Sequence, residues 1–156
     1  MTSDYMSGKA NTAIVENLRR VLADTFVLYF KTHSFHWNVE GPNFKSLHEL
    51  FELQYNELWA ATDIIAERIR TLDAYAPANW DDMMKFASLQ QTGQHPDAKA
   101  MVEELANDNM AIVKDTLYPA LHAAQAAEDE ATTDIIIGRI DIHEKTAWML
   151  RSTAKG

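Results

Sequence analysis

Helix-breaking residues are sparse in this chain and fall in only a few places. The clearest breaks are Gly41-Pro42, Pro77, the stretch 93–96 and the polar stretch 128–133. Between these breaks, alanine, leucine, glutamate and methionine recur with helical spacing. This pattern predicts four long helices, over roughly residues 10–38, 43–73, 97–126 and 131–153. No valine-rich alternating run is present, so we expect an all-α four-helix bundle without a sheet.

The connection between the second and third long segments differs from the other connections in its length. Two parallel neighbouring helices need a long crossover of this kind. Within it, residues 78–89 contain Asn79, which is suited to cap a short helix. Inside the third long segment Pro119 has no backbone N–H, so we expect it to kink or loosen that helix near its end.

The chain has 156 residues and no cysteine. Its length suits a single domain over residues 1–156, with residues 1–9 as a flexible N-terminal tail. Without cysteine, disulfides and thiolate zinc sites are excluded, and any metal ion must be held by His, Asp and Glu. No apolar run approaches the roughly 20 residues that span a bilayer, and the N-terminus lacks the pattern of a signal peptide. We therefore expect a cytoplasmic protein with no membrane partner.

The second long segment carries two different stripes of side chains. The stripe expected to face the core consists of Leu47, Phe51, Leu58, Ile65, Ile69 and Leu72. A second stripe, about 120° away at the ordinary helical twist, consists of His48, Glu52, Tyr55, Trp59, Asp63 and Glu67. Three further apolar residues lie on neither stripe: Leu50, Leu53 and Ile64. A helix that is apolar on several sides is expected to be buried on several sides, so we expect a partner subunit against it.

Two pairs of candidate metal ligands lie on the second stripe. His48 and Glu52 are four residues apart, and so are Asp63 and Glu67, so each pair projects from one side of the helix. The centres of the pairs are separated by about 22 Å along the helix, too far to share one metal ion within a chain. In a twofold dimer, an antiparallel copy of the helix crossing near residues 57 and 58 brings His48 towards Glu67 of the partner subunit. The same crossing brings Glu52 towards Asp63 of the partner subunit, which gives two equivalent sites.

His36, at the end of the first helix, is a fifth candidate ligand. Two imidazoles and three carboxylates form an oxygen-rich set that suits iron better than structural zinc, and peroxide or dioxygen can oxidise ferrous iron held there. The alternative is that the carboxylates belong to a solvated face or to salt bridges, such as Glu67 with Arg68 or Arg70. The sequence contains no Glu-x-x-His motif, which argues against a di-iron site built inside one subunit.

Two segments of the chain match signatures of a known family. His36-Trp37-Asn38-Val39-Glu40-Gly41-Pro42-Asn43-Phe44, followed by Leu47-His48-Glu49 and Ala66-Glu67-Arg68, closely resembles the Dps family of mini-ferritins. The segment 143–150, with the sequence His-Glu-Lys-Thr-Ala-Trp-Met-Leu, resembles the second signature of that family. The resemblance implies a ferritin-like four-helix bundle with a short helix in the crossover between helices 2 and 3. It also implies a hollow dodecamer built from twofold dimers.

The resemblance further implies an activity and a site. Proteins of this family are ferroxidases that oxidise Fe(II), preferably with hydrogen peroxide rather than dioxygen, and store ferric mineral in the shell, which protects against oxidative damage. Their two-iron centre lies at the dimer interface. By position, its ligands are His36, His48 and Glu52 of one subunit with Asp63 and Glu67 of the other. Many relatives have Asp in place of Glu52, and the longer side chain is expected to shift the first iron or to make that ligand more mobile.

Two ring-bearing residues next to the ligands have two interpretations each. Trp37 is adjacent to His36 and suited to intercept stray oxidising equivalents, or it simply packs at the subunit contact. His33 lies one helical turn before His36. It either reaches the site or its supporting acids, or it is a hydrogen-bonded interface histidine, which is the interpretation we favour.

Acidic residues gather near the start of the last helix. Asp129 and Asp134 match positions that line the threefold pores through which iron enters the shell in relatives, and carboxylates there would attract cations. The other interpretation is that Asp129, Asp134 and their acidic neighbours stabilise the N-terminus of a helix. The two interpretations are compatible.

Several Dps proteins bind DNA through lysine-rich tails, so a DNA-compacting protein is the alternative function. Here residues 1–15 contain only Lys9 in addition to neutral and acidic residues, and the C-terminus offers Arg151 and Lys155. A chain with a formal net charge of −9 repels phosphate. We therefore expect weak or absent DNA binding, and iron oxidation as the function.

Overall fold

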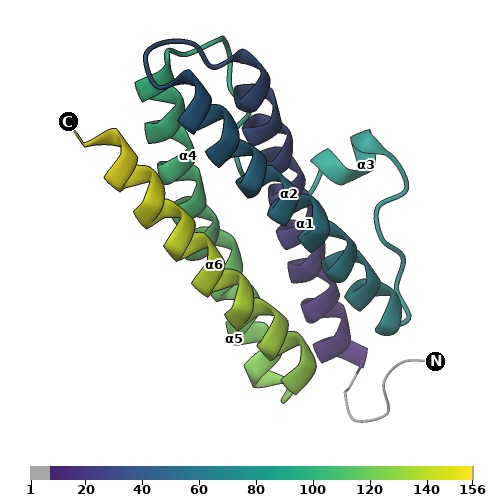
Figure 1. Ribbon diagram of the computed structural model, residues 1–156. Coiled ribbons are helices and arrows are strands. Elements are labelled where there is room, and N and C mark those ends of the chain that lie inside the picture. Colours follow the sequence, from purple (N-terminus) through teal and green to yellow (C-terminus); the bar gives the residue numbers. More distant parts are fainter. Residues whose placement is uncertain (1–7, 156) are drawn as a thin grey trace.

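In the computed structural model the described residues are 8–155. They form α1 (Gly8–Asn38), α2 (Phe44–Thr71), α3 (Trp80–Met84), α4 (Ala98–Ile112), α5 (Tyr118–Ala126) and α6 (Glu130–Ala154), with a π-helix at Val113–Leu117 between α4 and α5. No strand occurs in this part of the chain. The all-α bundle is confirmed, with α4, the π-helix and α5 together forming the third long rod (Figure 1).

The N-terminal boundary differs slightly from the expected one. The first helix begins at Gly8, two residues before its predicted start. The predicted flexible tail therefore loses residues 8 and 9 to α1, and its remaining part, residues 1–7, lies outside the described residues.

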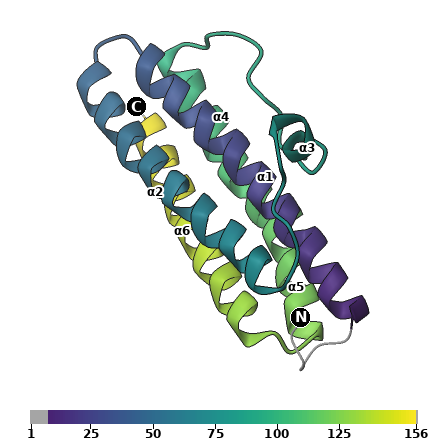
Figure 2. The same cartoon turned by 90° about the vertical axis from the view of Figure 1, so that its right-hand side faces the viewer.

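Two antiparallel helix pairs make up the bundle. α1 packs against α2, and α4 with α5 packs against α6. The crossover after α2 returns along the outside of the bundle, carrying α3 beside α1, so α2 and α4 run parallel (Figures 1 and 2). The predicted cap of the short helix is confirmed, because the Asn79 side chain accepts a hydrogen bond of 2.9 Å from the Asp82 N–H. None of the helices formed by residues 8–155 combines the length and apolar character needed to cross a membrane.

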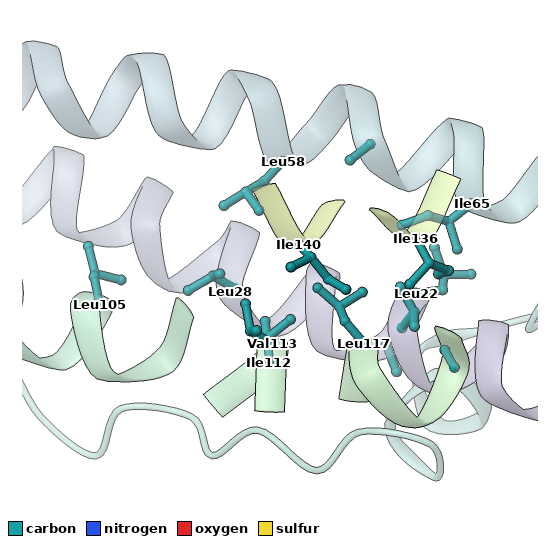
Figure 3. Packing of buried hydrophobic residues seen from close by; sticks show 14 of the residues in the cluster. Leu22, Leu28, Leu58, Ile65, Leu105, Ile112, Val113, Leu117, Ile136 and Ile140 are labelled. Atoms are coloured by element: carbon teal, nitrogen blue, oxygen red, sulfur yellow. The ribbon is translucent and has the colours of Figure 1, made fainter. Parts of the chain in front are cut away.

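The core-facing stripe of α2 is buried as predicted, with every one of its six apolar side chains at most 5% exposed. Figure 3 shows how it meets the other helices, with Leu58 and Ile65 directed towards Ile136 and Ile140 of α6. Removing a large side chain from such a core costs about 2–5 kcal/mol. The core therefore fixes the rotation of α2 about its axis, and with it the direction of the second stripe.

A buried carboxylate holds the crossover to the bundle. Asp24 of α1 has no exposed surface, and it accepts hydrogen bonds from the Ser88 N–H (2.7 Å), the Leu89 N–H (2.9 Å) and the Ser88 hydroxyl (2.8 Å). The fourth donor is the hydroxyl of Thr116, at 2.7 Å. Because Thr116 lies in the π-helix, the wide turn and the crossover are joined through one side chain.

The predicted disturbance near Pro119 is confirmed, and it takes the form of the π-helix immediately before it. Proline has no N–H to donate to the carbonyl of Asp115, four residues earlier. The guanidinium of Arg20 donates to that carbonyl instead, at 3.4 Å. α1 thus compensates the irregular part of the third rod.

Candidate metal centre

A tight turn places the end of α1 beside the start of α2. Gly41, between the two helices, has φ +119°, a backbone conformation that residues other than glycine rarely adopt. The turn brings His36 of α1 against His48 of α2, with the two imidazole rings stacked 3.8 Å apart and inclined by 15°.

The two histidines hold each other through the backbone. Nδ1 of His36 donates to the carbonyl of His48 at 2.7 Å, and Nδ1 of His48 donates to the carbonyl of His36 at 2.7 Å. A carbonyl only accepts hydrogen bonds, so each Nδ1 carries a proton, and in the neutral form of either ring the lone pair lies on Nε2. This is the arrangement in which backbone contacts fix the tautomer and orientation of metal-binding histidines.

The three candidate carboxylates are exposed on α2. Within residues 8–155, the carboxylates of Glu52, Asp63 and Glu67 form no ion pair and accept no hydrogen bond from a side chain or the backbone. The salt bridges considered for Glu67 are not found there. Arg68 pairs with Asp129 at 2.8 Å, and Arg70 donates to the carbonyl of Ala74 at 2.7 Å. The carboxylates therefore remain free to bind a ligand.

The chain divides its candidate ligands into two groups. His36 and His48 lie together, and Glu52 follows His48 by one helical turn. Asp63 and Glu67 lie farther along the same helix. Among the described residues, no group of three or more His, Asp and Glu side chains is close enough to hold a metal ion.

Aromatic rings surround the histidine pair. Tyr55 stacks on His33 at 3.7 Å and also contacts the ring of His36 at 5.1 Å. Partial burial raises the pKa of Tyr55, and the nearby Glu52 and Tyr29 raise it further. The phenol therefore stays protonated, which is compatible with its place beside exposed carboxylates.

His33 forms a hydrogen bond within its own chain, and its place at a subunit interface stays a prediction. Its Nδ1 lies 2.9 Å from the hydroxyl of Tyr29, and burial together with the charge of His36 lowers its pKa, so it is neutral near pH 7. Trp37 lies 4.3 Å from the His33 ring and is 59% exposed in the single chain. That exposure leaves both interpretations of Trp37 open.

Asp129 and Asp134 have different surroundings. The side chain of Asp129 is fully buried, caps α6 by accepting from the Thr132 N–H at 3.1 Å, and binds Arg68. Burial by itself would raise the pKa of Asp129, but the hydrogen bonds from Thr132 and Arg68 outweigh it and lower the pKa. The helix-terminus interpretation is thus confirmed for Asp129, whose carboxylate does not reach the surface of the chain. Asp134 is exposed.

The bundle contains a polar network that no sequence motif indicated. Arg139 forms a bidentate ion pair with Glu57 and lies 3.1 Å from Nε2 of His143, whose Nδ1 contacts Asn109 at 2.8 Å. Burial, assisted by the charge of Arg139, lowers the pKa of His143 to about 3. One sequence feature could have indicated this network: Arg139 and His143 lie four residues apart, on one side of a helix with apolar neighbours.

The fold and the His36–His48 pair define a helical bundle with a candidate metal centre. Comparison with known proteins identifies a family with the same fold. The ferritin-like domain family matches residues 15–155. "DNA protection during starvation protein 2" of Bacillus anthracis is 38% identical over 143 residues, which cover 91% of this chain and 97% of that protein.

Two solved structures show the same similarity. Dps from Bacillus brevis has a TM-score of 0.91 at 35% identity, covering 96% of this chain and 100% of that one. Dps from Vibrio cholerae O1, described as a member of a broad superfamily of ferritin-like diiron-carboxylate proteins, has a TM-score of 0.91 at 27% identity, covering 99% and 97%. The chain belongs to the ferritin-like superfamily and, within it, to the Dps family.

Proposed function

We propose that this protein is a ferroxidase that oxidises Fe(II), preferably with hydrogen peroxide, at two-iron centres between twofold-related subunits. The proposal includes storage of the ferric product inside a dodecameric shell in the cytoplasm. The observation that carries it is the His36–His48 pair, in which both Nδ1 atoms are bound to backbone carbonyls and both Nε2 atoms remain for a metal.

The donor set fits iron. His36, His48 and Glu52 of one subunit and Asp63 and Glu67 of the other supply imidazole nitrogens and carboxylate oxygens, a combination typical of iron sites. The Vibrio cholerae relative is described as a diiron-carboxylate protein, which supports the same chemistry here. Because the two groups lie apart on one chain, an antiparallel α2 of a second subunit is needed to complete each centre.

The surface around the ligands suits a subunit contact. Three large aromatic side chains of α1 and α2 are more than half exposed in the single chain: Phe30 at 54%, Trp37 at 59% and Trp59 at 55%. Large apolar side chains left exposed on neighbouring helices are typical of interaction surfaces. Burying them against a second copy would also exclude water from the iron centre.

The reaction balances with two irons. Two Fe(II) ions give two electrons to one hydrogen peroxide, which takes up two protons and forms two water molecules, leaving two Fe(III) ions. Because both electrons reach the same peroxide, no hydroxyl radical is released. This stoichiometry explains how iron storage protects against oxidative damage.

Iron must also enter the shell. We assign this step to the exposed Asp134, because carboxylates repeated around a threefold axis attract cations. Asp129 contributes to the same region as the cap of α6, through its contacts with Thr132 and Arg68.

DNA compaction is the second candidate function, favoured by the name of the Bacillus anthracis relative, a DNA protection protein. The net charge of −9 opposes it. We expect no retention of plasmid DNA in a gel-shift assay at about 0.15 M salt without divalent cations, because phosphate contacts supply most non-specific affinity. Tight retention under these conditions would favour the DNA function.

The direct test of the ferroxidase function is anaerobic titration with Fe(II), followed by peroxide, on the wild type and on the His48→Ala and Asp63→Ala variants. We expect fast oxidation only in the wild type. Glu103→Ala, which removes an exposed carboxylate from α4, is the control and should match the wild type. Equal oxidation rates in all four proteins would refute the site, and a monomer or isolated dimer in size-exclusion chromatography would refute the shell.

A further inference from the structure

The polar network inside the bundle brings together two side chains of the kinds that bind metal ions. Glu57 lies on α2 and His143 on α6. Nδ1 of His143 donates to the amide oxygen of Asn109 on α4 at 2.8 Å, so the lone pair of the neutral ring lies on Nε2. Carboxylates and imidazoles on facing helices are the usual components of metal sites in bundle cores. The core therefore contains two potential ligands that the proposed iron centre does not use.

Arg139 occupies the donor atoms of both potential ligands. One terminal nitrogen of its guanidinium donates to Oε1 of Glu57 at 3.0 Å and to Nε2 of His143 at 3.1 Å. The other terminal nitrogen donates to Oε2 of Glu57. The Arg139 side chain is only 7% exposed, and arginine stays protonated in proteins. A permanent positive charge thus already contacts the same carboxylate and the same ring nitrogen that a metal ion would need.

A small cavity beside the network offers space for an ion. Its volume is about 20 Å³, enough for one water-sized ligand, and its walls include Gln54, Glu57, Asn109 and His143. The buried Nε2 of Gln54 has no hydrogen-bond partner among residues 8–155. Turning this amide by 180° would present its oxygen to the cavity as a third ligand. Arg139 opposes such an ion, because like charges repel strongly in the interior of a protein.

We propose that Arg139 keeps metal ions out of the bundle core, by holding the carboxylate of Glu57 and Nε2 of His143 with its own positive charge. The site that Arg139 blocks suits one divalent transition-metal ion, with Gln54 as the third ligand. This inference goes beyond the proposed ferroxidase function. It rests on that function only in its consequence, which is that Fe(II) is confined to the centres between subunits.

The number of electrons available at a single iron explains why exclusion matters. The core offers ligands for one metal ion. One Fe(II) gives one electron to hydrogen peroxide, which yields Fe(III), a hydroxide ion and a hydroxyl radical. The paired irons of a centre between subunits supply both electrons and release no radical. By keeping Fe(II) out of the core, Arg139 prevents radicals from forming among buried side chains.

The test uses Co(II) as the probe, because nitrogen and oxygen ligands generally bind it more tightly than Fe(II). The background is the full chain carrying His48→Ala and Asp63→Ala, which removes the proposed centres between subunits. We expect this protein to bind no Co(II) in equilibrium dialysis. Adding Arg139→Ala should lead to binding of one Co(II) per chain, with the visible absorption of cobalt in a protein site.

Further variants identify the ligands and control for charge. Glu57→Gln or His143→Gln, added to Arg139→Ala, should weaken Co(II) binding by about 100-fold or more, because each change removes a ligand. Arg151→Ala removes a positive charge from an exposed position on the same helix, and it should leave Co(II) binding at the background level. Arg139→Lys keeps the charge in the core and should also bind no Co(II).

The stability of Arg139→Ala is measured in parallel by circular dichroism, because the change also breaks an ion pair. Co(II) should raise the unfolding temperature of this variant, since a ligand that binds only the folded chain stabilises it. An Arg139→Ala chain that neither binds Co(II) nor is stabilised by it would refute the inference. Binding that Glu57→Gln does not weaken, or equal binding by Arg151→Ala, would refute it too.

Crystals of the wild type soaked in Co(II) test the exclusion without any substitution. Anomalous scattering should show no metal ion beside Glu57 and His143, and a metal ion bound there would refute the role of Arg139. None of these measurements depends on iron oxidation. A wild type that does not oxidise Fe(II) with peroxide would instead refute the ferroxidase function and leave the exclusion of metal from the core intact.

Discussion

Two regions of this molecule use the same kinds of side chain in opposite ways. Inside the bundle, the side chains of Arg139, Glu57, His143 and Asn109 are joined by contacts of 2.5 to 3.1 Å within their own chain. On the outer face of α1 and α2, the two histidines are held by the backbone, and the neighbouring carboxylates have no partner among residues 8–155.

The difference separates a structural role from a chemical one. In the internal network both ring nitrogens of His143 contact groups of the same chain, so this region stabilises one arrangement and leaves no imidazole nitrogen for a ligand. A histidine with a fixed ring and a free Nε2, beside unpaired carboxylates, is prepared for a ligand that the single chain does not provide. Both regions contain histidine and glutamate side chains. They differ in whether those side chains already have partners within the chain.

The largest expected effect comes from breaking the internal network. Glu57→Ala leaves the guanidinium of Arg139, whose side chain is 7% exposed, without its counter-charge. We expect the free energy of unfolding in urea to fall by about 3 kcal/mol, the lower end for a broken buried ion pair. Iron oxidation by the folded protein should be unchanged. A loss of oxidation without a loss of stability would reverse the assignment of the two regions.

Glu52→Ala is the matched change on the other face, in the same helix and with the same substitution. Loss of a supporting residue around a metal lowers affinity about 10–100-fold, so loss of a ligand should lower the oxidation rate at limiting iron by about 100-fold or more. Stability should stay within about 0.5 kcal/mol of the wild type, since the side chain is exposed. Stopped-flow absorbance at fixed Fe(II) measures the rate, and a wild-type rate would remove Glu52 from the site.

The two aspartates near the start of α6 should differ in the same way, with Asp129 affecting stability and Asp134 affecting iron uptake. Asp129→Ala removes a helix cap and the partner of Arg68, and we expect a loss of about 2 kcal/mol in thermal or urea unfolding. Asp134→Ala should leave stability unchanged and slow iron uptake into the assembled shell. If Asp134→Ala took up iron at the wild-type rate, the proposed path of iron into the shell would be incorrect.

Acid should affect the internal network through His143. Its pKa is about 3 in the folded chain, against an ordinary value of 6.5, so between these values the unfolded chain binds a proton that the folded chain does not. The neutral, buried His143 contributes fully to the free energy of unfolding above pH 6.5. As the pH falls below 6.5, this contribution decreases by about 1.4 kcal/mol per pH unit.

The variant His143→Gln isolates this slope. Its free energy of unfolding should depend less steeply on pH between 6.5 and 5 than that of the wild type. His122→Gln, at an exposed position on α5, should keep the wild-type slope. Identical slopes in all three proteins would show that His143 is not buried in its neutral form.

The local parts of the fold were predictable from the sequence. The period of the apolar residues identified the core stripe of α2, and the residue types at Asn79 and Pro119 indicated a cap and a disturbed helix. These features depend on neighbours within a few residues. The spacing of the ligand pairs on α2 was predictable for the same reason, because it depends only on residues four positions apart in one helix.

The remaining features depend on contacts between distant segments. The π-helix is joined to α1 by the hydrogen bond between Thr116 and Asp24, 92 positions apart, and the bond between Arg139 and Glu57 spans 82 positions. Asp129 was expected at a helix N-terminus, at a pore or at both, and the sequence did not show that Arg68, 61 positions away, pairs with its carboxylate. A sequence pattern names such residues as polar and does not say which partner they meet.

The central claim is that each iron centre combines His36, His48 and Glu52 of one subunit with Asp63 and Glu67 of another. The most direct measurement is peroxide-driven Fe(II) oxidation by shells containing equal amounts of His48→Ala and Asp63→Ala chains, co-expressed with different tags. Each variant alone should be inactive. In a mixed dimer one centre receives both defects and the other receives none, so random pairing should restore about one quarter of the wild-type rate. A mixed shell as inactive as its parents would contradict a centre shared between subunits.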